Sequence, residues 1–118
     1  MSDKHTVLLV DDDVDVREVL TTILSKPFNL LVAAHGTEAM SIIVDWQVDL
    51  LLTDIVMPGM NGFDLADRAI AMRPGLRVIY MTGYSDQALS TRPKYGKVIR
   101  KPFRPVQMVS EIQSALAG

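Results

Sequence analysis

Apolar and polar residues follow two alternating patterns along this chain. Short, unbroken apolar runs predict buried strands, whereas apolar residues that recur every three or four positions predict amphipathic helices. The runs predict five strands, at residues 6–10, 29–34, 49–54, 76–81 and 97–100. The helical spacing predicts helices at residues 16–24, 36–46, 63–72 and 105–116, and a short, weak helix at 86–91. Strands and helices therefore alternate along the whole chain.

This alternation predicts the fold class. Short connections between alternating strands and helices are typical of an α/β domain, in which a parallel sheet carries helices on both faces. Right-handed crossovers bring the carboxyl ends of all strands to one edge of the sheet, and ligands of open α/β sheets bind at that edge. The chain of 118 residues is long enough for one core and too short for two, so residues 1–118 are expected to form a single domain.

The strand predicted at residues 49–54 ends in a single carboxylate. Its three consecutive leucines are typical of a central parallel strand that is buried on both faces. Asp54 closes this strand, and Asp54 is therefore expected at the functional edge of the sheet. The residues that follow favour a turn: Pro58, Gly59, Asn61 and Gly62.

Other reactive side chains follow the other predicted strands. Asp11 and Asp12 come directly after the first strand. Thr82 ends the fourth strand, and Lys101 follows the fifth. Carboxylates at close range raise one another's pKa, and a hard divalent cation relieves that repulsion. Because all-oxygen ligands suit Mg²⁺, we predict a magnesium site at Asp11, Asp12 and Asp54.

The same residues suit phosphoryl transfer to Asp54. A carboxylate can attack phosphorus and form an acyl phosphate. A metal ion and the Lys101 ammonium would neutralise the oxygens of the transferring group, which is the assistance that this reaction needs most. The Thr82 hydroxyl can donate a hydrogen bond to one of those oxygens.

Composition narrows the possible partners and compartment. The net charge is −2 and the pI about 5.5, so nothing suggests direct binding of nucleic acid or of an anionic membrane. The absence of cysteine excludes disulfides and thiolate metal sites. No apolar run approaches the ~20 residues of a membrane span, and the first residues show no signal-peptide pattern. We expect a cytoplasmic protein.

Five motifs together resemble the receiver domain of two-component response regulators. They are Val10-Asp11-Asp12, Asp54, Met57-Pro58-Gly59-Met60-Asn61-Gly62, Thr82-Gly83 and Lys101-Pro102-Phe103. The resemblance covers essentially the whole chain and implies a flavodoxin-like (βα)5 fold with strand order 2-1-3-4-5. It also implies a signalling switch or phosphorelay module that accepts a phosphoryl group from the phosphohistidine of a histidine kinase or of a histidine phosphotransfer domain.

The resemblance further implies a role for each residue of the site. Asp54 is the phosphoacceptor, Thr82 the switch hydroxyl and Lys101 the phosphate-binding lysine, and the Lys101-Pro102 bond is expected to be cis. The implied ligands of Mg²⁺ are Asp11, Asp12, Asp54 and the backbone carbonyl of Val56. Such a module catalyses its own phosphorylation and slow dephosphorylation and turns over no external substrate, so it is not expected to be an enzyme.

One position departs from the family's usual pattern, and two further positions bear on the lifetime of the phosphoryl group. Val98 stands three residues before Lys101, where an aromatic residue often rotates on activation. An aromatic switch in its usual form is therefore in doubt, although three tyrosines are near enough in sequence to substitute: Tyr80, Tyr84 and Tyr95. Val56 and Tyr84 flank the path of the hydrolytic water in the family, and their apolar and bulky side chains predict a long-lived phosphoryl group.

Other functions remain open from the residues alone. A flavin- or nucleotide-binding module would need a Gly/Ser/Thr-rich phosphate cradle after the first strand, where Asp11–Asp13 stands. A Mg²⁺-dependent phosphohydrolase would need a second acid at the position of Val56 and a cap over its substrate. A pseudo-receiver would switch without phosphate. The chain can also be a receiver excised from a hybrid histidine kinase or a larger regulator, and its kinase, downstream target and oligomeric state stay open.

Several residues are expected to have structural roles only. Asp13 favours the N-terminal cap of a helix. His5 and His35 are isolated and expected to be exposed. We interpret Arg17 and Arg104 as solvated surface charges. The residues expected to pack in the core include Met40, Trp46 and Met72.

Overall fold

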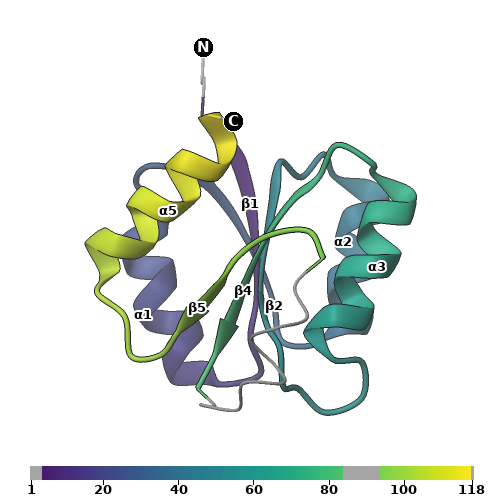
Figure 1. Cartoon of the computed structure of the whole chain (residues 1–118), viewed down its shortest axis with the longest axis horizontal. Helices are drawn as coiled ribbons and strands as arrows, with labels where there is room; N and C mark the ends of the chain where they lie inside the picture. Colours follow the sequence, from purple (N-terminus) through teal and green to yellow (C-terminus); the bar gives the residue numbers. More distant parts are fainter. Residues whose placement is uncertain (1–3, 84–93, 118) are drawn as a thin grey trace.

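The computed structural model describes residues 4–83 and 94–117, which form strands and helices in the predicted alternation (Figure 1). The elements are β1 (Thr6–Val10), α1 (Val14–Leu24), β2 (Asn29–Ala33), α2 (Gly36–Asp45), β3 (Leu50–Asp54), α3 (Gly62–Met72), β4 (Arg77–Thr82), β5 (Val98–Arg100) and α5 (Pro105–Ala117). The short helix predicted at 86–91 lies outside the described residues. The other predicted elements are confirmed, with ends that differ by one or a few residues.

The five strands form one parallel sheet with the order β2-β1-β3-β4-β5. This is the flavodoxin-like order that the resemblance implied, and it puts β1 and β3 side by side at the centre of the sheet. The strands all run in one direction, so their carboxyl ends share an edge, at the bottom of Figure 1, while both chain termini lie at the top. The prediction of fold class is confirmed.

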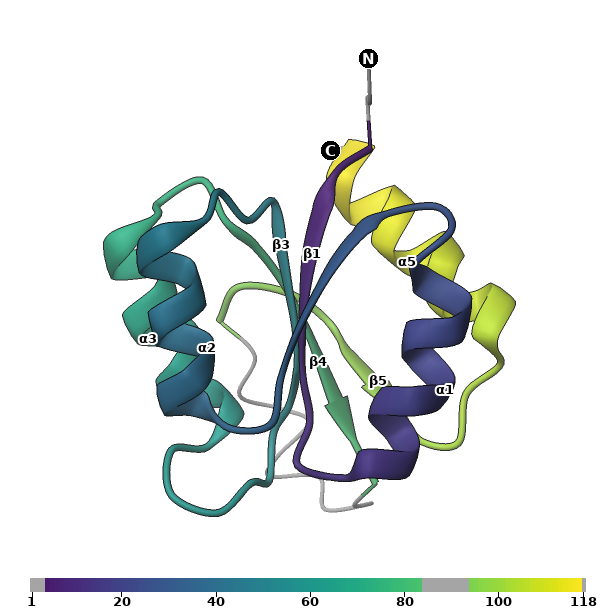
Figure 2. The same ribbon diagram turned by 180° about the vertical axis from the view of Figure 1, so that it is seen from behind.

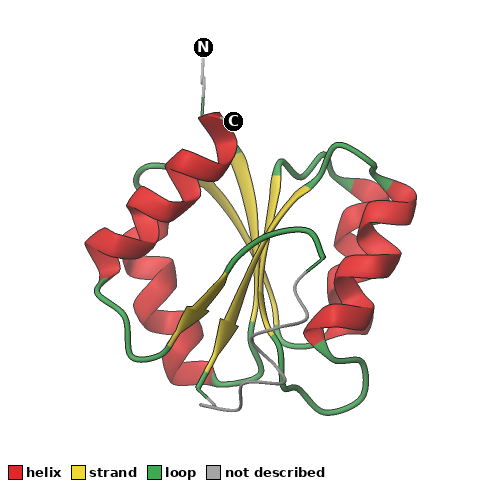
Figure 3. Ribbon diagram, viewed as in Figure 1, coloured by secondary structure: helices red, strands yellow, loops and turns green. Residues whose placement is uncertain are grey.

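Helices cover both faces of this sheet, as Figures 2 and 3 show from opposite sides. Helices α2 and α3 lie on one face, and α1 and α5 lie on the other. Because successive strand residues point to opposite faces, each central strand contributes to both cores. In β3, Leu51 packs toward α2 and α3, whereas Leu50 and Leu52 pack toward α1 and α5. All three leucines are fully buried, which explains the unbroken apolar run.

Polar caps begin three of the helices. The Asp13 carboxylate accepts hydrogen bonds from the amides of Asp15 and Val16, so its predicted role as the N-cap of α1 is confirmed. Asn61 caps α3 in the same way, by accepting from the Asp64 amide. His35 is exposed as predicted, and its Nδ1 accepts from the backbone of α2. These caps fix where each helix leaves the loop that precedes it.

Two apolar residues expected to pack inward are instead exposed. Trp46 is 58% exposed because α2 ends at Asp45, so the next position of the helical period falls beyond the last turn. Met72 is the last residue of α3 and is 41% exposed. Val19 matches the helical spacing of α1 but lies on its outer side. Met40 does pack against the core, as predicted.

Candidate functional site

Alternation along the strands aims three charged side chains at the same region. Asp11 follows Val7 and Leu9 at two-residue steps, and both of these residues face α1 and α5. Asp54 follows Leu50 and Leu52 in the same way, and Lys101 follows Ile99. Two carboxylates and one ammonium therefore leave three strands on the same face, at the carboxyl edge of the sheet.

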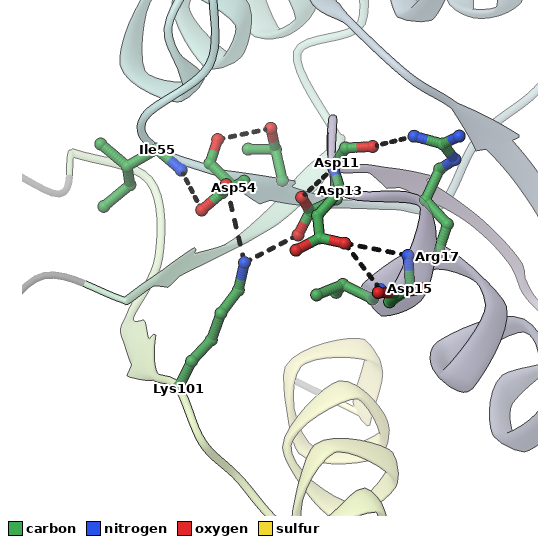
Figure 4. Close-up of polar contacts among 9 residues, drawn as sticks. Asp11, Asp13, Asp15, Arg17, Asp54, Ile55 and Lys101 are labelled. Carbon is green, nitrogen blue, oxygen red and sulfur yellow. Dashed lines mark hydrogen bonds and ion pairs between the residues drawn. The ribbon is translucent and has the colours of Figure 1, made fainter.

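Lys101 bridges the two carboxylates (Figure 4). Its Nζ lies 2.8 Å from Oδ2 of Asp11 and 3.6 Å from Oδ2 of Asp54. Asp11 is fully buried and Asp54 is 7% exposed, so this contact is largely shielded from water. Oδ1 of Asp11 accepts a hydrogen bond of 3.0 Å from the Asp13 amide. The site is thus held together by residues that are up to 90 positions apart in sequence.

The predicted metal ligands also converge. Asp11, Asp12 and Asp54 each offer a carboxylate oxygen, and these oxygens all lie within 4.8 Å of one another. Asp12 is exposed, which leaves the cluster open to solvent on one side. The donor set consists of hard oxygens, and among the described residues this cluster includes neither His5 nor His35. The chemistry of the cluster therefore fits a hard divalent cation.

Burial and like charge disfavour ionisation of Asp54. Loss of hydration raises its pKa most, and the neighbouring charge of Asp11 raises it further. The Lys101 ammonium and a hydrogen bond from the Ile55 amide, 3.1 Å from Oδ1, act in the opposite direction. The pKa of Asp54 is raised to about 6. The carboxylate therefore sits in a pocket that favours either a proton or a cation beside it.

The same surroundings favour the charged form of Lys101, whereas they disfavour the charged form of Asp54. Burial lowers its pKa, but its hydrogen bond to Asp11 and the charge of Asp54 outweigh that effect. The pKa of Lys101 is raised, so the side chain stays an ammonium ion at neutral pH. The bond between Lys101 and Pro102 is cis, as the resemblance implied.

Thr82 and Val56 complete the set of residues singled out in the sequence. Thr82 is buried at the end of β4, directly after Met81, the register partner of Asp54. Its carbonyl accepts a 2.7 Å hydrogen bond from the Lys101 amide, which ties the ends of β4 and β5 together. Val56 lies in the loop after β3 with its side chain partly exposed. The roles of Thr82 and of the Val56 carbonyl stay predictions.

Glycines set the path of the loop that follows Asp54. Gly62, the first residue of α3, lies so close to the Asp54 carbonyl that a Cβ would clash with it. The Gly62 amide donates a 2.8 Å hydrogen bond to the Ile55 carbonyl, which closes the loop on itself. Gly59 has a φ of 77°, a conformation that L-residues other than glycine rarely adopt. The loop after Asp54 therefore turns back tightly into α3.

Arg17 has a role that the sequence did not reveal. It was interpreted as a surface charge, but its guanidinium reaches back from α1 and Nη1 donates a 2.8 Å hydrogen bond to the backbone carbonyl of Asp11 (Figure 4). Its side chain is half-buried. The interpretation was wrong because an arginine on an amphipathic helix gives no sign of which carbonyl it will contact. Arg104 is exposed, as predicted.

Tyr80 is buried in the core and does not lie free at the site. It pairs with Val98 in the sheet register and packs on Phe63 of α3 at a centroid distance of 5.2 Å. Burial raises the pKa of Tyr80 to about 12, against a hydrogen bond from the Tyr95 amide that lowers it. The ring therefore links β4 to α3 and to the start of β5. Tyr84, the second candidate for an aromatic switch, lies outside the described residues.

A model of the response regulator receiver domain matches residues 7–113 of this sequence. The chain belongs to this family. Receiver domains are the phosphoryl-accepting signalling modules of response regulators, which partner with histidine kinases in two-component systems. They are signalling modules and not classical enzymes.

Individual relatives agree with this assignment. The response regulator receiver protein CpdR of Brucella abortus is 38% identical over 114 residues, which cover 93% of this chain and 95% of CpdR. The DNA-binding response regulator MtrA of Mycobacterium tuberculosis is 31% identical over 117 residues, and this receiver chain spans about half of MtrA (51%). A CheY-like receiver domain from Methanospirillum hungatei has a TM-score of 0.89 at 28% identity and covers 98% of this chain and 95% of its own.

In the receiver chain, residues 4–83 and 94–117 contain no helix long and apolar enough to cross a bilayer.

Proposed function

We propose that this receiver accepts a phosphoryl group on Asp54, in a reaction that depends on Mg²⁺ bound by Asp11, Asp12 and Asp54. The observation that carries the proposal is the contact of one ammonium, Lys101 Nζ, with the buried carboxylates of Asp11 and Asp54 inside a cluster of three acids. Thr82 supplies the switch hydroxyl. The backbone carbonyl of Val56 is the fourth protein ligand of the metal.

The proposed step forms one bond and breaks another. A carboxylate oxygen of Asp54 attacks the phosphorus of a phosphohistidine, the new O–P bond forms as the P–N bond breaks, and the imidazole leaves with a proton from water. Lys101 Nζ lies close to both acids, so it can stabilise the negative charge that develops on the phosphoryl oxygens. Bound Mg²⁺ would supply a second positive charge at the same oxygens. No external substrate is turned over in this scheme.

The raised pKa of Asp54 agrees with this use of the site. A carboxylate that is crowded by Asp11 and by burial is poorly stabilised as a free anion. An acyl phosphate at this position carries more negative charge than the free carboxylate, so the modified form would need the Lys101 ammonium and a bound cation beside it. A structural ion pair with Lys101 alone would leave the third carboxylate, Asp12, unexplained.

The phosphodonor is proposed to be a histidine kinase or a histidine phosphotransfer domain in the cytoplasm. An apolar groove of about 290 Å³ runs beside the site, between α1 and the segment after β5. Val16, Val19 and Leu20 line one side of it, and Pro102 and Phe103 line the other. Exposed Val19 makes this surface suitable for an apolar helix of the donor, with its phosphohistidine directed toward Asp54. We propose that this chain does not itself bind nucleic acid.

A small phosphodonor tests the acceptor role. Phosphoramidate with Mg²⁺ should add one phosphoryl group per chain, seen by intact mass spectrometry, and the label should map to Asp54. Asp54→Asn should abolish labelling, whereas Asp64→Asn, which removes an exposed acid on α3, should leave it unchanged. Rapid release of phosphate without stoichiometric label would indicate a phosphohydrolase. No label at all would indicate a pseudo-receiver.

We also propose that the phosphoryl group is long-lived. The Val56 side chain stands in the loop beside Asp54 and is apolar, so it cannot orient a hydrolytic water. Val56→Asn combined with Tyr84→Ala should shorten the half-life of the phosphorylated protein several-fold, as followed by mass spectrometry after removal of the donor. An unchanged half-life in the double variant would contradict the proposal.

A further inference from the structure

Asp12 is the acid of the cluster with the least side-chain support. Asp11 is fixed by Lys101 and by the Asp13 amide, and Asp54 by Lys101 and the Ile55 amide. Across the described parts of the chain, no hydrogen bond or ion pair holds the exposed Asp12 carboxylate. The position of this carboxylate therefore depends on the backbone that carries it.

The backbone on each side of Asp12 is held by side chains. On the carboxyl-terminal side, Asp13 is fixed as the cap of α1. On the amino-terminal side, the Asp11 carbonyl belongs to the same peptide unit as the Asp12 amide. That carbonyl is buried with its residue and accepts the 2.8 Å hydrogen bond from Arg17 Nη1. A charge-assisted bond of this kind is stronger than one between neutral groups.

We propose that Arg17 is a positioning residue that sets the Asp11–Asp12 peptide and thereby holds the Asp12 carboxylate in place for the metal. The inference rests on the proposed function, because it concerns the same cation site. Arg17 does not touch the phosphoryl group and acts only through the backbone. In Figure 4 the guanidinium meets the Asp11 backbone carbonyl, while the Asp11 carboxylate points toward Lys101.

Removal of the guanidinium should weaken cation binding more than it destabilises the fold. Arg17→Met keeps most of the aliphatic stem that packs along α1 but offers no donor to the Asp11 carbonyl. Residues that orient metal ligands typically change affinity by 10–100-fold when they are replaced. We expect Arg17→Met to weaken Mg²⁺ binding by about tenfold. Arg17→Lys, which keeps the charge and one donor, should recover part of this loss.

Direct binding to the unphosphorylated chain provides the test. Mg²⁺ affinity would be measured by calorimetry, and Mn²⁺ affinity by the electron paramagnetic resonance signal of the free ion. Arg68→Ala serves as the control, because it removes one positive charge from the exposed side of α3. The control should bind both ions as the unaltered chain does. The melting temperature of each variant in EDTA reports separately on the fold.

The outcomes are distinguishable. Weaker binding in Arg17→Met, with recovery in Arg17→Lys and none of the loss in Arg68→Ala, supports the proposal. A lower melting temperature with unchanged affinity shows a structural role only and overturns it. If Arg17→Met does not fold, Arg17→Lys carries the test, since one flexible donor in place of the planar guanidinium should still weaken affinity measurably, and an unchanged affinity overturns the proposal. If the unaltered chain binds neither ion, the metal dependence under the proposed function fails instead.

Discussion

The two edges of the same sheet differ in the contacts that their charged residues make. At the amino edge, charged side chains satisfy backbone groups. Oδ2 of Asp49 accepts a 2.7 Å hydrogen bond from the Thr6 amide, Arg73 donates to the carbonyls at the end of α2, and Arg77 donates to the Ala115 carbonyl of α5. At the carboxyl edge, Asp11 and Asp54 crowd together around Lys101.

This difference separates charges that stabilise the fold from charges that we propose to take part in phosphoryl transfer. Asp49 is exposed, and its hydrogen bond with the Thr6 amide joins the start of β1 to the residue before β3. Asp54 is buried beside another acid, and its raised pKa shows that this position disfavours the ionised carboxylate. Strain of this kind persists at functional sites because the rest of the fold holds the groups in place. Neutralising the crowded acid Asp54 should therefore stabilise the fold, whereas removing the carboxylate of Asp49 should destabilise it.

The largest effect is expected at Lys101. Lys101→Met leaves the fully buried Asp11 without its cation, and an unpaired buried charge is strongly unfavourable. In EDTA we expect the free energy of unfolding to fall by about 2–3 kcal/mol, in part recovered by Mg²⁺. Urea unfolding followed by circular dichroism measures this. Lys94→Met, which removes an exposed ion pair with Asp67, should cost well under 1 kcal/mol. Equal losses in the two variants would contradict the comparison.

A gain in stability is expected when the central acid is neutralised. Asp54→Asn removes an ionised group that the folded state disfavours. At pH 7.5 in EDTA, the free energy of unfolding should rise by about 2–3 kcal/mol, as a pKa raised from 3.8 to about 6 implies. Chemical unfolding measures the change, and addition of Mg²⁺ should narrow the gap between the variant and the unaltered chain. A destabilised Asp54→Asn would show that the acid supports the fold.

The same shift predicts a pH dependence with a definite sign. The pKa of Asp54 is higher in the folded chain than the ordinary value of 3.8, so the folded state holds the proton more tightly. The stability that this protonation contributes is lost as the pH rises from 3.8 toward about 6 and is constant above that. The difference between Asp54→Asn and the unaltered chain should therefore grow over that range. If the stability difference between Asp54→Asn and the unaltered chain did not change between about pH 4 and about pH 7, the raised pKa would be contradicted.

The smallest effect is expected at the opposite edge. Asp49→Ala removes the acceptor for the Thr6 amide, which water can partly replace because Asp49 is exposed. We expect a loss of about 1 kcal/mol in the free energy of unfolding. Mg²⁺ affinity and labelling by phosphoramidate should not change, since this residue lies at the far edge of the sheet. A loss of labelling in this variant would mean that the two edges are coupled.

The sequence by itself determined the elements, the strand order that follows from the family resemblance, and the residues at the carboxyl edge. These depend on local patterns: apolar runs, helical spacing and turn residues such as Gly62 act over a few positions. Asp11, Asp54 and Lys101 could be grouped because parallel strands bring their carboxyl ends to one edge. The cap role of Asp13 was predictable for the same local reason.

Only the tertiary structure decided how strongly these groups perturb one another and which charges are structural. The pKa of Asp54 depends on burial by elements distant in sequence, and the contact between Lys101 and Asp11 spans 90 positions. Arg17 appeared to be a surface charge until the folded helix aimed it at the Asp11 carbonyl. Trp46 fitted the helical period, yet α2 stops one residue earlier and leaves it exposed. Periodicity predicts which face of a helix or strand a residue lies on. Its burial, its pKa and its hydrogen bonds depend on neighbours that only the folded chain brings together.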